Sequence, residues 1–497
     1  MRLLKSPLFC TAVVFVLGLT SCSTFFPSRA YDDAGLELRQ SIDAILADSI
    51  FIPARVGIKV VSMSDGRVLY ERASRALFHP ASNLKLLTSA TALHALGKDY
   101  KFKTALYADS LSEDGEIIEN LYLKGFGNPD LKVRDLHWMV EQLRAKGVKT
   151  VHGDVVGDVS FFDDLFWGNG WMWDDEPSFY EAFITPLSIN DNSVRVLVAA
   201  GEKIGDPVHV RLDPETKYLS VANHGLTSPD ATENTIEVTR DFKERSNTII
   251  VKGALPHNAK EREFVLSVWR PELYAVTLLR EELEREGIAV EGTTHLGAMN
   301  GEAKQLVLHE WPIDPVVINL NKSSDNLSAE NTLKVIAAER RGIPGTSRAG
   351  ISVVNEFLSS LGIDTTSYLM VDGSGVSHYN LISAETTARL LTAMFTEKST
   401  RARFDLFYAS LPIAGVDGTL GNRMKGTAAE GMIRAKTGTI SGVSSLSGYA
   451  KTRDGGFLAF SMMMQHFVGS SKPYRDAQDK IAELLSQFRY GPSTASR

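Results

Sequence analysis

The sequence predicts an α/β (α+β) protein with one antiparallel sheet, helices on both of its faces and a large, mainly β insertion. Helical and strand-like patterns alternate in residues 33–100 and return in residues 311–497, so we expect these two parts to form one domain. Between them, residues 101–310 contain short β-type runs separated by Gly, Asp and Asn, which indicates an inserted region of two subdomains. A chain of 497 residues is long enough for two or three domains.

The first part of the chain predicts a helix, a hairpin and a second helix. Residues 35–51 have the apolar spacing of an amphipathic helix. Residues 56–61 and 68–69 flank Ser64-Asp65-Gly66, which is typical of two strands joined by a turn. From Leu84 onward apolar residues recur at helical spacing, so we expect Ser82 at the start of a helix.

The remaining elements follow the same periodicities. In the insertion we expect strands at 121–127, 151–159, 194–198 and 248–251. We also expect two helices there, at 136–146 and 273–286. After residue 313 we expect three helices, at 329–340, 349–361 and 384–396. Three strands follow, at 433–436, 443–451 and 456–465, and a closing helix covers 474–488. Strands near both ends of the chain predict a sheet shared by the two termini.

Residues 1–22 have the pattern of an export signal. Arg2 and Lys5 precede an apolar run over residues 8–19, which is too short for a permanent membrane span. The ending Leu19-Thr20-Ser21-Cys22 resembles the lipobox of bacterial lipoproteins, which implies lipidation of Cys22 and a tether over residues 23–32. The alternative is an ordinary signal peptide cut near Ala30.

The location of the mature protein follows from this hypothesis. Ser23 follows Cys22 instead of the Asp that often marks inner-membrane retention, so we expect a periplasmic protein anchored by lipid to the outer membrane of a Gram-negative cell. The only other cysteine is Cys10, inside the signal, so we expect no internal disulfide.

Charge and motifs argue against several classes of function. The net charge is −7 and the sequence has no basic stripe, so we expect no nucleic-acid partner. No phosphate-binding loop, His-Glu-x-x-His pattern or other paired metal-ligand spacing occurs, so we expect no metal and no cofactor.

Ser82 is the candidate nucleophile. It is the only serine with a lysine three residues later, and Lys85 would lie one helical turn away on the same face. A serine hydroxyl is a weak nucleophile that needs a base in contact, and a lysine can act as that base when burial or a neighbouring cation lowers its pKa. The alternative is a chance spacing, so partner motifs are needed.

Two later stretches supply such partners. Ser324-Asp325-Asn326 precedes a predicted helix, and Lys436-Thr437-Gly438 lies on a predicted strand. We expect Ser324 to relay a proton to the leaving amine, and Asn326 to orient Lys85 and hold the substrate amide. Lys436 is the candidate cation beside Lys85 and a candidate ligand of a substrate carboxylate.

The third motif also offers a place for the substrate backbone. Gly438 would let the substrate approach the strand closely, beside Thr437 and Thr439. The backbone N–H groups of Ser82 and Thr439 are the expected pair that stabilises the oxyanion of a tetrahedral intermediate.

The trio Ser-x-x-Lys, Ser-Asp-Asn and Lys-Thr-Gly is the signature of penicillin-binding proteins and serine β-lactamases. This chain resembles one family in particular: the class C low-molecular-mass penicillin-binding proteins, D-alanyl-D-alanine carboxypeptidase/endopeptidases of the DacB type in peptidase family S13. The long interval between Ser82 and Ser324 fits that family. Further stretches carry the resemblance, namely 126–131, 170–175, 371–375 and 415–420.

The resemblance implies a β-lactamase-like catalytic domain, peptidoglycan stem peptides as substrate, and covalent inhibition by β-lactam antibiotics. It also implies that Asp175 reads the amino group of the stem-peptide diamino acid, whereas the alternative for Asp175 is a solvated loop acid. Trp167, Trp171 and Trp173 are candidates either for core packing or for the lining of a glycopeptide groove.

Two rival functions stay open. One is a β-lactamase or esterase of the same fold, which would need a route for deacylating water that the sequence does not reveal. The other is a non-catalytic cell-wall-binding lipoprotein, which would have no need for Lys85.

Overall fold

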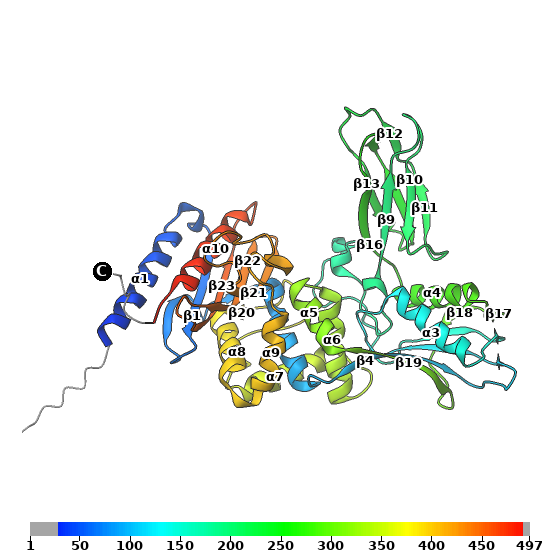
Figure 1. Ribbon diagram of the computed structural model, residues 1–497, viewed down its shortest axis with the longest axis horizontal. Helices are drawn as coiled ribbons and strands as arrows, with labels where there is room; N and C mark the ends of the chain where they lie inside the picture. The colour runs from blue at the N-terminus through cyan, green and yellow to red at the C-terminus, as the bar shows by residue number, and fades with distance from the viewer. Residues whose placement is uncertain (1–27, 491–497) are drawn as a thin grey trace, which may run out of the picture.

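The computed structural model describes residues 28–490 and contains the predicted antiparallel sheet (Figure 1). The strand order is β2-β1-β23-β22-β21, and every neighbouring pair is antiparallel. The strands are β1 Arg55–Ser62, β2 Val68–Arg72, β21 Ile433–Ile440, β22 Val443–Lys451 and β23 Phe457–Gln465. Strands from the two ends of the chain meet where β1 pairs with β23, so the predicted fold class is confirmed.

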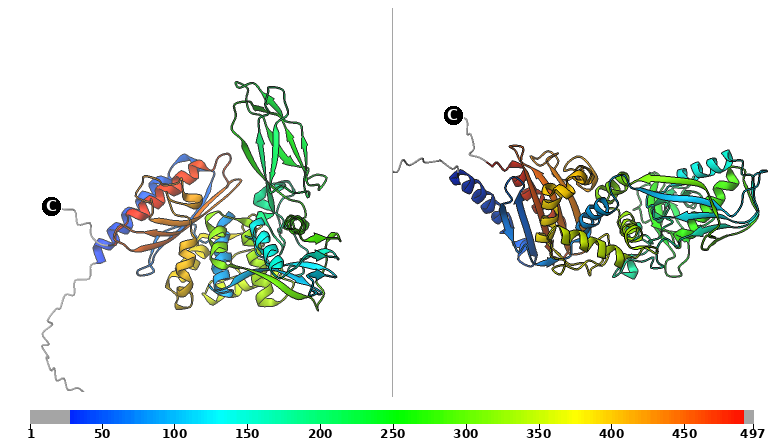
Figure 2. Two further views of the ribbon diagram at one scale, coloured as in Figure 1. Left: turned by 45° about the vertical axis from the view of Figure 1, so that its right-hand side comes forward. Right: turned by 90° about the horizontal axis from the view of Figure 1, so that it is seen from below.

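Helices cover both faces of this sheet. On one face, α1 (Ser28–Leu46) and α10 (Lys472–Gln487) lie side by side in both Figure 1 and Figure 2. Their apolar residues share a core with the sheet that includes Ile42, Phe460 and Leu485. On the other face, α8 (Ala384–Thr396) packs on the central strands.

The predicted tether over residues 23–32 is wrong for residues 28–32, which form the first turns of α1. No proline or glycine separates Ser28 from Asp33, so nothing in the sequence prevents the helix from starting there. The signal and Cys22 lie outside the described residues. No helix within residues 28–490 combines the length and hydrophobicity needed to cross a membrane.

A layer of helices joins the sheet to the insertion. Its members are α2 Lys85–Ala95, α5 Ile313–Lys322, α6 Asn326–Arg341, α7 Ser347–Ser360 and α9 Lys398–Ser410. They share one buried apolar core with Phe78 and Tyr449 of the sheet region. The sequence did not predict α9, because charged residues interrupt its apolar pattern.

The insertion leaves and re-enters the catalytic domain through two paired strands. β4 (Lys101–Ala108) is antiparallel to β19 (Lys304–Pro312), with Phe102 opposite Trp311. These strands belong to a sheet of order β18-β8-β6-β4-β19, on which α3 and α4 pack. The other elements are β6 Leu121–Gly125, β8 Val155–Asp158, β18 Thr294–Leu296, α3 Val133–Ala145 and α4 Pro271–Arg285.

A second group of strands projects from this sheet, as Figures 1 and 2 show. It consists of three small sheets with the orders β10-β9-β16, β11-β14-β13 and β12-β15. Their strands are β9 Ser193–Ala199, β10 His209–Asp213, β11 Ser220–Asn223, β12 Leu226–Ser228, β13 Glu237–Arg240, β14 Thr248–Lys252, β15 Ala254–Pro256 and β16 Arg262–Ser267.

One part of the predicted insertion, residues 159–192, packs against the catalytic domain. Phe161 and Phe162 are buried in the core of the catalytic helices. The buried ammonium of Lys334 on α6 binds Asp163 Oδ1 at 2.6 Å and Leu165 O at 2.6 Å. A buried lysine needs such partners, so this segment is fixed to α6 and is available to form a wall of the active site.

Candidate active site

Ser82 lies in a short 3₁₀ turn, Ala81–Leu84, that leads directly into α2. Ala81 adopts a left-handed backbone conformation with φ of 46°, which costs a non-glycine residue about 1–3 kcal/mol. Gly375 supports this turn closely, since a Cβ there would lie 2.0 Å from Ala81 O. The turn places Ser82 Oγ 3.1 Å from Lys85 Nζ.

Lys85 is fully buried and uses all three hydrogens of its ammonium. Nζ donates to Ser82 Oγ, to Asn326 Oδ1 at 2.5 Å and to Ser374 O at 2.8 Å. Burial lowers the pKa of Lys85 to about 8, although nearby acids, first among them Asp325, oppose this change. A lysine with this pKa is neutral in about a tenth of the molecules at pH 7, far more than an ordinary lysine, and the neutral form can accept the proton of Ser82.

Ser324 and Lys436 form a second pair. Ser324 precedes α6 with φ of 61°, and Lys436 Nζ on β21 donates to its Oγ at 2.8 Å. Burial and the positive charge of Lys85 lower the pKa of Lys436 well below its usual range. Burial is the first cause of the lowered pKa of Lys85, and the expected repulsion between the two ammonium groups is seen in the lowered pKa of Lys436.

Asn326 connects the base to the wall contributed by residues 159–192. It is the first residue of α6, whose N-cap Asp325 accepts from Ser328 N at 2.5 Å. Its Oδ1 accepts from Lys85, and its Nδ2 donates to Tyr180 O at 2.7 Å. The side chain therefore orients Lys85, as the sequence predicted, and also holds the neighbouring segment.

Gly438 brings β21 against the nucleophile turn. A Cβ on Gly438 would lie 2.7 Å from Pro80 O and 3.0 Å from Ser82 N, both of which are backbone atoms. Only glycine fits this contact. The N–H groups of Ser82 and Thr439 are thus carried by backbone segments in direct contact, as an oxyanion hole requires.

A buried acid network behind Lys85 was missed by the sequence reasoning. Glu330 Oε1 accepts from the N–H groups of Gly373 and Ser374, both at 2.8 Å, and so fixes the loop whose Ser374 carbonyl binds Lys85. Burial, followed by the charge of Asp372, raises the pKa of Glu330 to about 7. The signal in the sequence was the position of Glu330, four residues after Asn326 on the same helix face.

A cleft of about 950 Å³ contains these groups. Ser82, Ser324, Asn326, Thr437, Gly438 and Thr439 line it, together with Asp174, Asp175, Tyr180, Glu181, Thr419, Arg423 and Arg475. The structure thus brings together all residues predicted from the three motifs, and it places Asp175 in the same cleft.

Asp175 and the tryptophans show different degrees of burial. Asp175 Oδ2 accepts from Met172 N at 2.9 Å, which closes a short turn at the cleft wall. Trp171 is buried and donates from Nε1 to Asp372 at 3.1 Å, so it has a packing role. Trp173 is 73 % exposed and Trp167 is half-buried.

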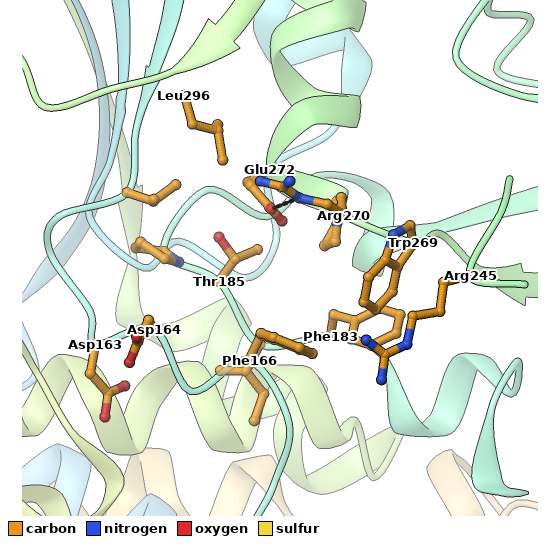
Figure 3. A pocket seen from close by; sticks show the side chains of 14 residues that line it. Asp163, Asp164, Phe166, Phe183, Thr185, Arg245, Trp269, Arg270, Glu272 and Leu296 are labelled. Atoms are coloured by element: carbon orange, nitrogen blue, oxygen red, sulfur yellow. Dashed lines mark hydrogen bonds and ion pairs between the residues drawn. The ribbon is translucent and has the colours of Figure 1, made fainter. Parts of the chain in front are cut away.

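A second hollow, of about 460 Å³, lies between residues 159–186 and residues 245–296 of the insertion (Figure 3). Phe166, Phe183 and Trp269 form its aromatic wall, and the guanidinium of Arg245 lies 5.3 Å from the Trp269 ring centre. None of the lining residues that the structure describes is a serine, cysteine or lysine, so this hollow has no nucleophile and base pair like that of the cleft.

One cluster within residues 28–490 has the spacing of a metal site, formed by His137, Glu282 and Glu286. Arg285 binds Glu282 and Arg144 binds Glu286, so arginines already compensate both carboxylates. His137 lies on α3, Glu282 lies on α4 and Glu286 directly follows α4, so the cluster belongs to the insertion and contains no residue of the three motifs.

Comparison with known proteins gives one consistent result. Residues 38–488 match the D-Ala-D-Ala carboxypeptidase 3 (S13) family. The chain is 38 % identical over 467 residues to a D-alanyl-D-alanine carboxypeptidase of Actinomadura sp. strain R39, covering 91 % of this chain and 85 % of that protein. It is 25 % identical over 436 residues to D-alanyl-D-alanine carboxypeptidase DacB of Haemophilus influenzae, covering 87 % and 89 %.

A solved structure shares the fold. The crystal structure of penicillin-binding protein 4 (dacB) from Haemophilus influenzae superimposes with a TM-score of 0.78 at 23 % identity, covering 90 % of this chain and 99 % of that one. The family resemblance seen in the sequence is therefore confirmed: this chain belongs to the D-Ala-D-Ala carboxypeptidase 3 (S13) family of serine peptidases.

Proposed function

We propose that the protein is an exported serine DD-peptidase that releases the terminal D-Ala of peptidoglycan stem peptides and cleaves D-Ala–diamino acid crosslinks. The contact of Lys85 Nζ with Ser82 Oγ, at 3.1 Å in a cleft of peptide size, carries this proposal. A protein that only bound the cell wall would have no use for a buried lysine whose pKa is lowered to about 8.

In the acylation step, neutral Lys85 takes the proton of Ser82 while Oγ attacks the carbonyl carbon of the penultimate D-Ala. The N–H groups of Ser82 and Thr439 stabilise the oxyanion. The C–N bond then breaks, and the proton that Lys85 took from Ser82 passes to the leaving amine through Ser324, which Lys436 holds in place, so Lys85 is neutral again. An ester between Ser82 and the stem peptide remains.

In the deacylation step, water attacks this ester. Lys85 accepts a proton from the water, and the tetrahedral intermediate uses the same two N–H donors. The ester bond breaks, the proton returns to Ser82 Oγ, and the shortened stem peptide leaves as a carboxylate.

Substrate recognition follows from the charges of the cleft. Asp175 is the proposed ligand of the diamino acid's amino group, supported by its place in the cleft next to Glu181. The hydroxyls of Thr437 and Thr439 and the ammonium of Lys436 are the proposed ligands of the carboxylate of the terminal D-Ala.

β-Lactams are the proposed covalent inhibitors, because they present the same carboxylate and a reactive amide to Ser82. The Haemophilus influenzae penicillin-binding protein 4 has been solved in complex with a β-lactam, which supports this proposal.

One observation favours a second candidate, a β-lactamase of the same fold. Glu181 lines the cleft, and burial raises its pKa to about 6, so it is ionised at neutral pH and is placed where it could activate water. The persistence of the penicillin adduct separates the two functions. A stable adduct supports the DD-peptidase, and rapid turnover supports the β-lactamase.

For the location, we propose a lipid anchor on Cys22 and a periplasmic catalytic domain at the outer membrane. The lipobox-like sequence supports this proposal. Cell fractionation of the wild type and Cys22→Ala tests it, and recovery of both proteins in the soluble fraction would refute it.

The catalytic proposal is tested by mass spectrometry of the products formed from defined monomeric and crosslinked muropeptides, together with labelling by fluorescent penicillin. Ser82→Ala is expected to abolish both activities. Covalent labelling of Ser82→Ala would overturn the assignment of the nucleophile.

A further inference from the structure

The cleft that contains Ser82 is lined by groups of opposite charge from different elements. Asp174 and Glu181 come from the segment between the insertion's strands, whereas Arg423 comes from the segment that precedes β21 and Arg475 comes from α10. A substrate that carries an amino group on one side of the scissile bond and carboxylates on the other would match such a cleft.

Both arginines line the same cleft as the group that protonates the leaving amine. Ser324, the proposed relay, is bound by Lys436. The hydroxyl of the next residue, Thr437, is 2.7 Å from that of Thr419, and Arg423 follows in the same segment. A leaving group released beside Ser324 therefore shares the cleft with both arginines.

The two arginines differ in whether a carboxylate compensates their charge. Arg423 forms an ion pair with Asp479 at 2.6 Å. It also donates to the backbone oxygen of Arg475 at 3.3 Å, so the two arginines are neighbours. Arg475 is half-buried, and within residues 28–490 no carboxylate forms an ion pair with its guanidinium. Burial raises the pKa of Asp479 and the charge of Arg475 opposes this change, but this carboxylate is already bound by Arg423.

We propose that Arg475 binds a carboxylate of an extended leaving group and thereby favours the cleavage of crosslinks. This inference rests on the proposed DD-peptidase function. A released D-Ala has a single carboxylate next to its amine, within reach of Thr437 and Thr439. The leaving group of a crosslink is a diamino acid in a second stem peptide, which has further carboxylates at a greater distance from the scissile bond. A guanidinium suits such a group because it binds a carboxylate through two parallel hydrogen bonds.

The chemistry of the step is that of the proposed acylation. The bond between the D-Ala carbonyl carbon and the diamino acid nitrogen breaks, Ser82 Oγ forms the ester, and the nitrogen receives one proton through Ser324. Arg475 takes no part in bond making. It binds the leaving peptide, and a cleft of about 950 Å³ has room for that peptide.

The test compares two substrates and one probe in the same variants. For Arg475→Ala, kcat/KM for a crosslinked muropeptide dimer is expected to fall about tenfold, because one charge-assisted contact is lost. For D-Ala release from a monomeric pentapeptide, kcat/KM is expected to change less than twofold, and so is the rate of acylation by penicillin. Arg475→Lys is expected to recover part of the loss on the crosslinked substrate. Lys480→Ala, which removes an exposed charge on the same helix outside the cleft, is the matched control and is expected to leave all three rates unchanged.

The outcomes separate this inference from the proposed function. Equal losses on both muropeptides would overturn it, because Arg475 would then bind a group common to both leaving groups. Unchanged cleavage of the dimer would overturn it as well. Wild-type protein that is acylated by penicillin and releases D-Ala, but leaves the dimer intact, would refute the inference while the DD-peptidase function stands. Wild-type protein that is not acylated at all would refute the function itself.

Discussion

Gly438→Ala tests whether the contact between β21 and the nucleophile turn forms the oxyanion hole. The new Cβ would lie 2.3 Å from Ser445 Oγ, 2.7 Å from Pro80 O and 3.0 Å from Ser82 N. An ordinary contact begins at 3.4 Å, so β21 and the turn must separate by about 0.7 Å at Pro80. Oxyanion donors act at about 2.7–3.1 Å, so this separation removes Thr439 N from useful range.

The expected result is a loss of roughly 10²–10³-fold in the rate of acylation by penicillin, the effect of losing one oxyanion donor. The overpacked contact is expected to lower the free energy of unfolding by about 1–3 kcal/mol. Stopped-flow acylation and thermal unfolding measure the two effects separately. Gly301→Ala is the control, since no atom lies within 4 Å of a Cβ at that position.

A double variant makes the argument refutable. Gly438→Ala with Ser445→Ala removes the hydroxyl contact but leaves the backbone contacts to Pro80 and Ser82. We expect acylation to stay low in the double variant. Recovery to wild-type rates would show that only the hydroxyl clash mattered, and that the approach of β21 to the turn does not form the oxyanion hole.

Three further predictions concern the base, its surroundings and the core. The acylation rate is expected to rise with pH with a midpoint of about 8 and to be roughly tenfold below its maximum at pH 7, because only neutral Lys85 accepts a proton; a flat profile from pH 6 to 9 would contradict this. Glu330→Gln keeps an acceptor for the loop but removes a negative charge that raises the pKa of Lys85, so the midpoint of the acylation rate is expected to move to lower pH. Glu282→Gln, which changes a buried acid of the insertion, is the control, and a shift of the Glu330→Gln midpoint to higher pH would refute the reasoning. Phe162→Ala is expected to lower the free energy of unfolding by about 3–5 kcal/mol in urea titrations, since the ring is buried against the catalytic core, and a loss below about 1 kcal/mol would show that this segment is not part of that core.

Much of the sheet and most of the helices could be predicted from periodicity, because their apolar residues follow regular spacings. The two strands of the first hairpin and the closing α10 are examples. Local patterns are less informative where tertiary contacts decide the structure. α9 has an interrupted apolar pattern and is stabilised by packing on α5 and α8, so the sequence alone did not reveal it.

The motifs could be predicted because each places its residues on one local element, such as Ser82 and Lys85 on one helical turn. Contacts between distant segments could not. The bond from Lys85 to the carbonyl of Ser374 joins residues 289 positions apart, and it depends on a loop conformation that no spacing reveals. The wall of the cleft at Tyr180 likewise depends on a contact between distant segments, because its carbonyl accepts from Asn326, which lies 146 positions later.

One face of α6 accounts for how these distant segments are held in place. Asn326, Glu330 and Lys334 follow one another at intervals of four residues, so their side chains share one side of the helix. Asn326 binds Lys85, Glu330 binds the loop at Ser374, and Lys334 binds the segment at Asp163. Because burying charged groups costs stability unless they are paired, an apolar face would make a more stable helix. The polar face is therefore best explained by its role in positioning other groups. A single rigid helix holds Lys85, the loop at Ser374 and the segment at Asp163 in fixed places relative to one another.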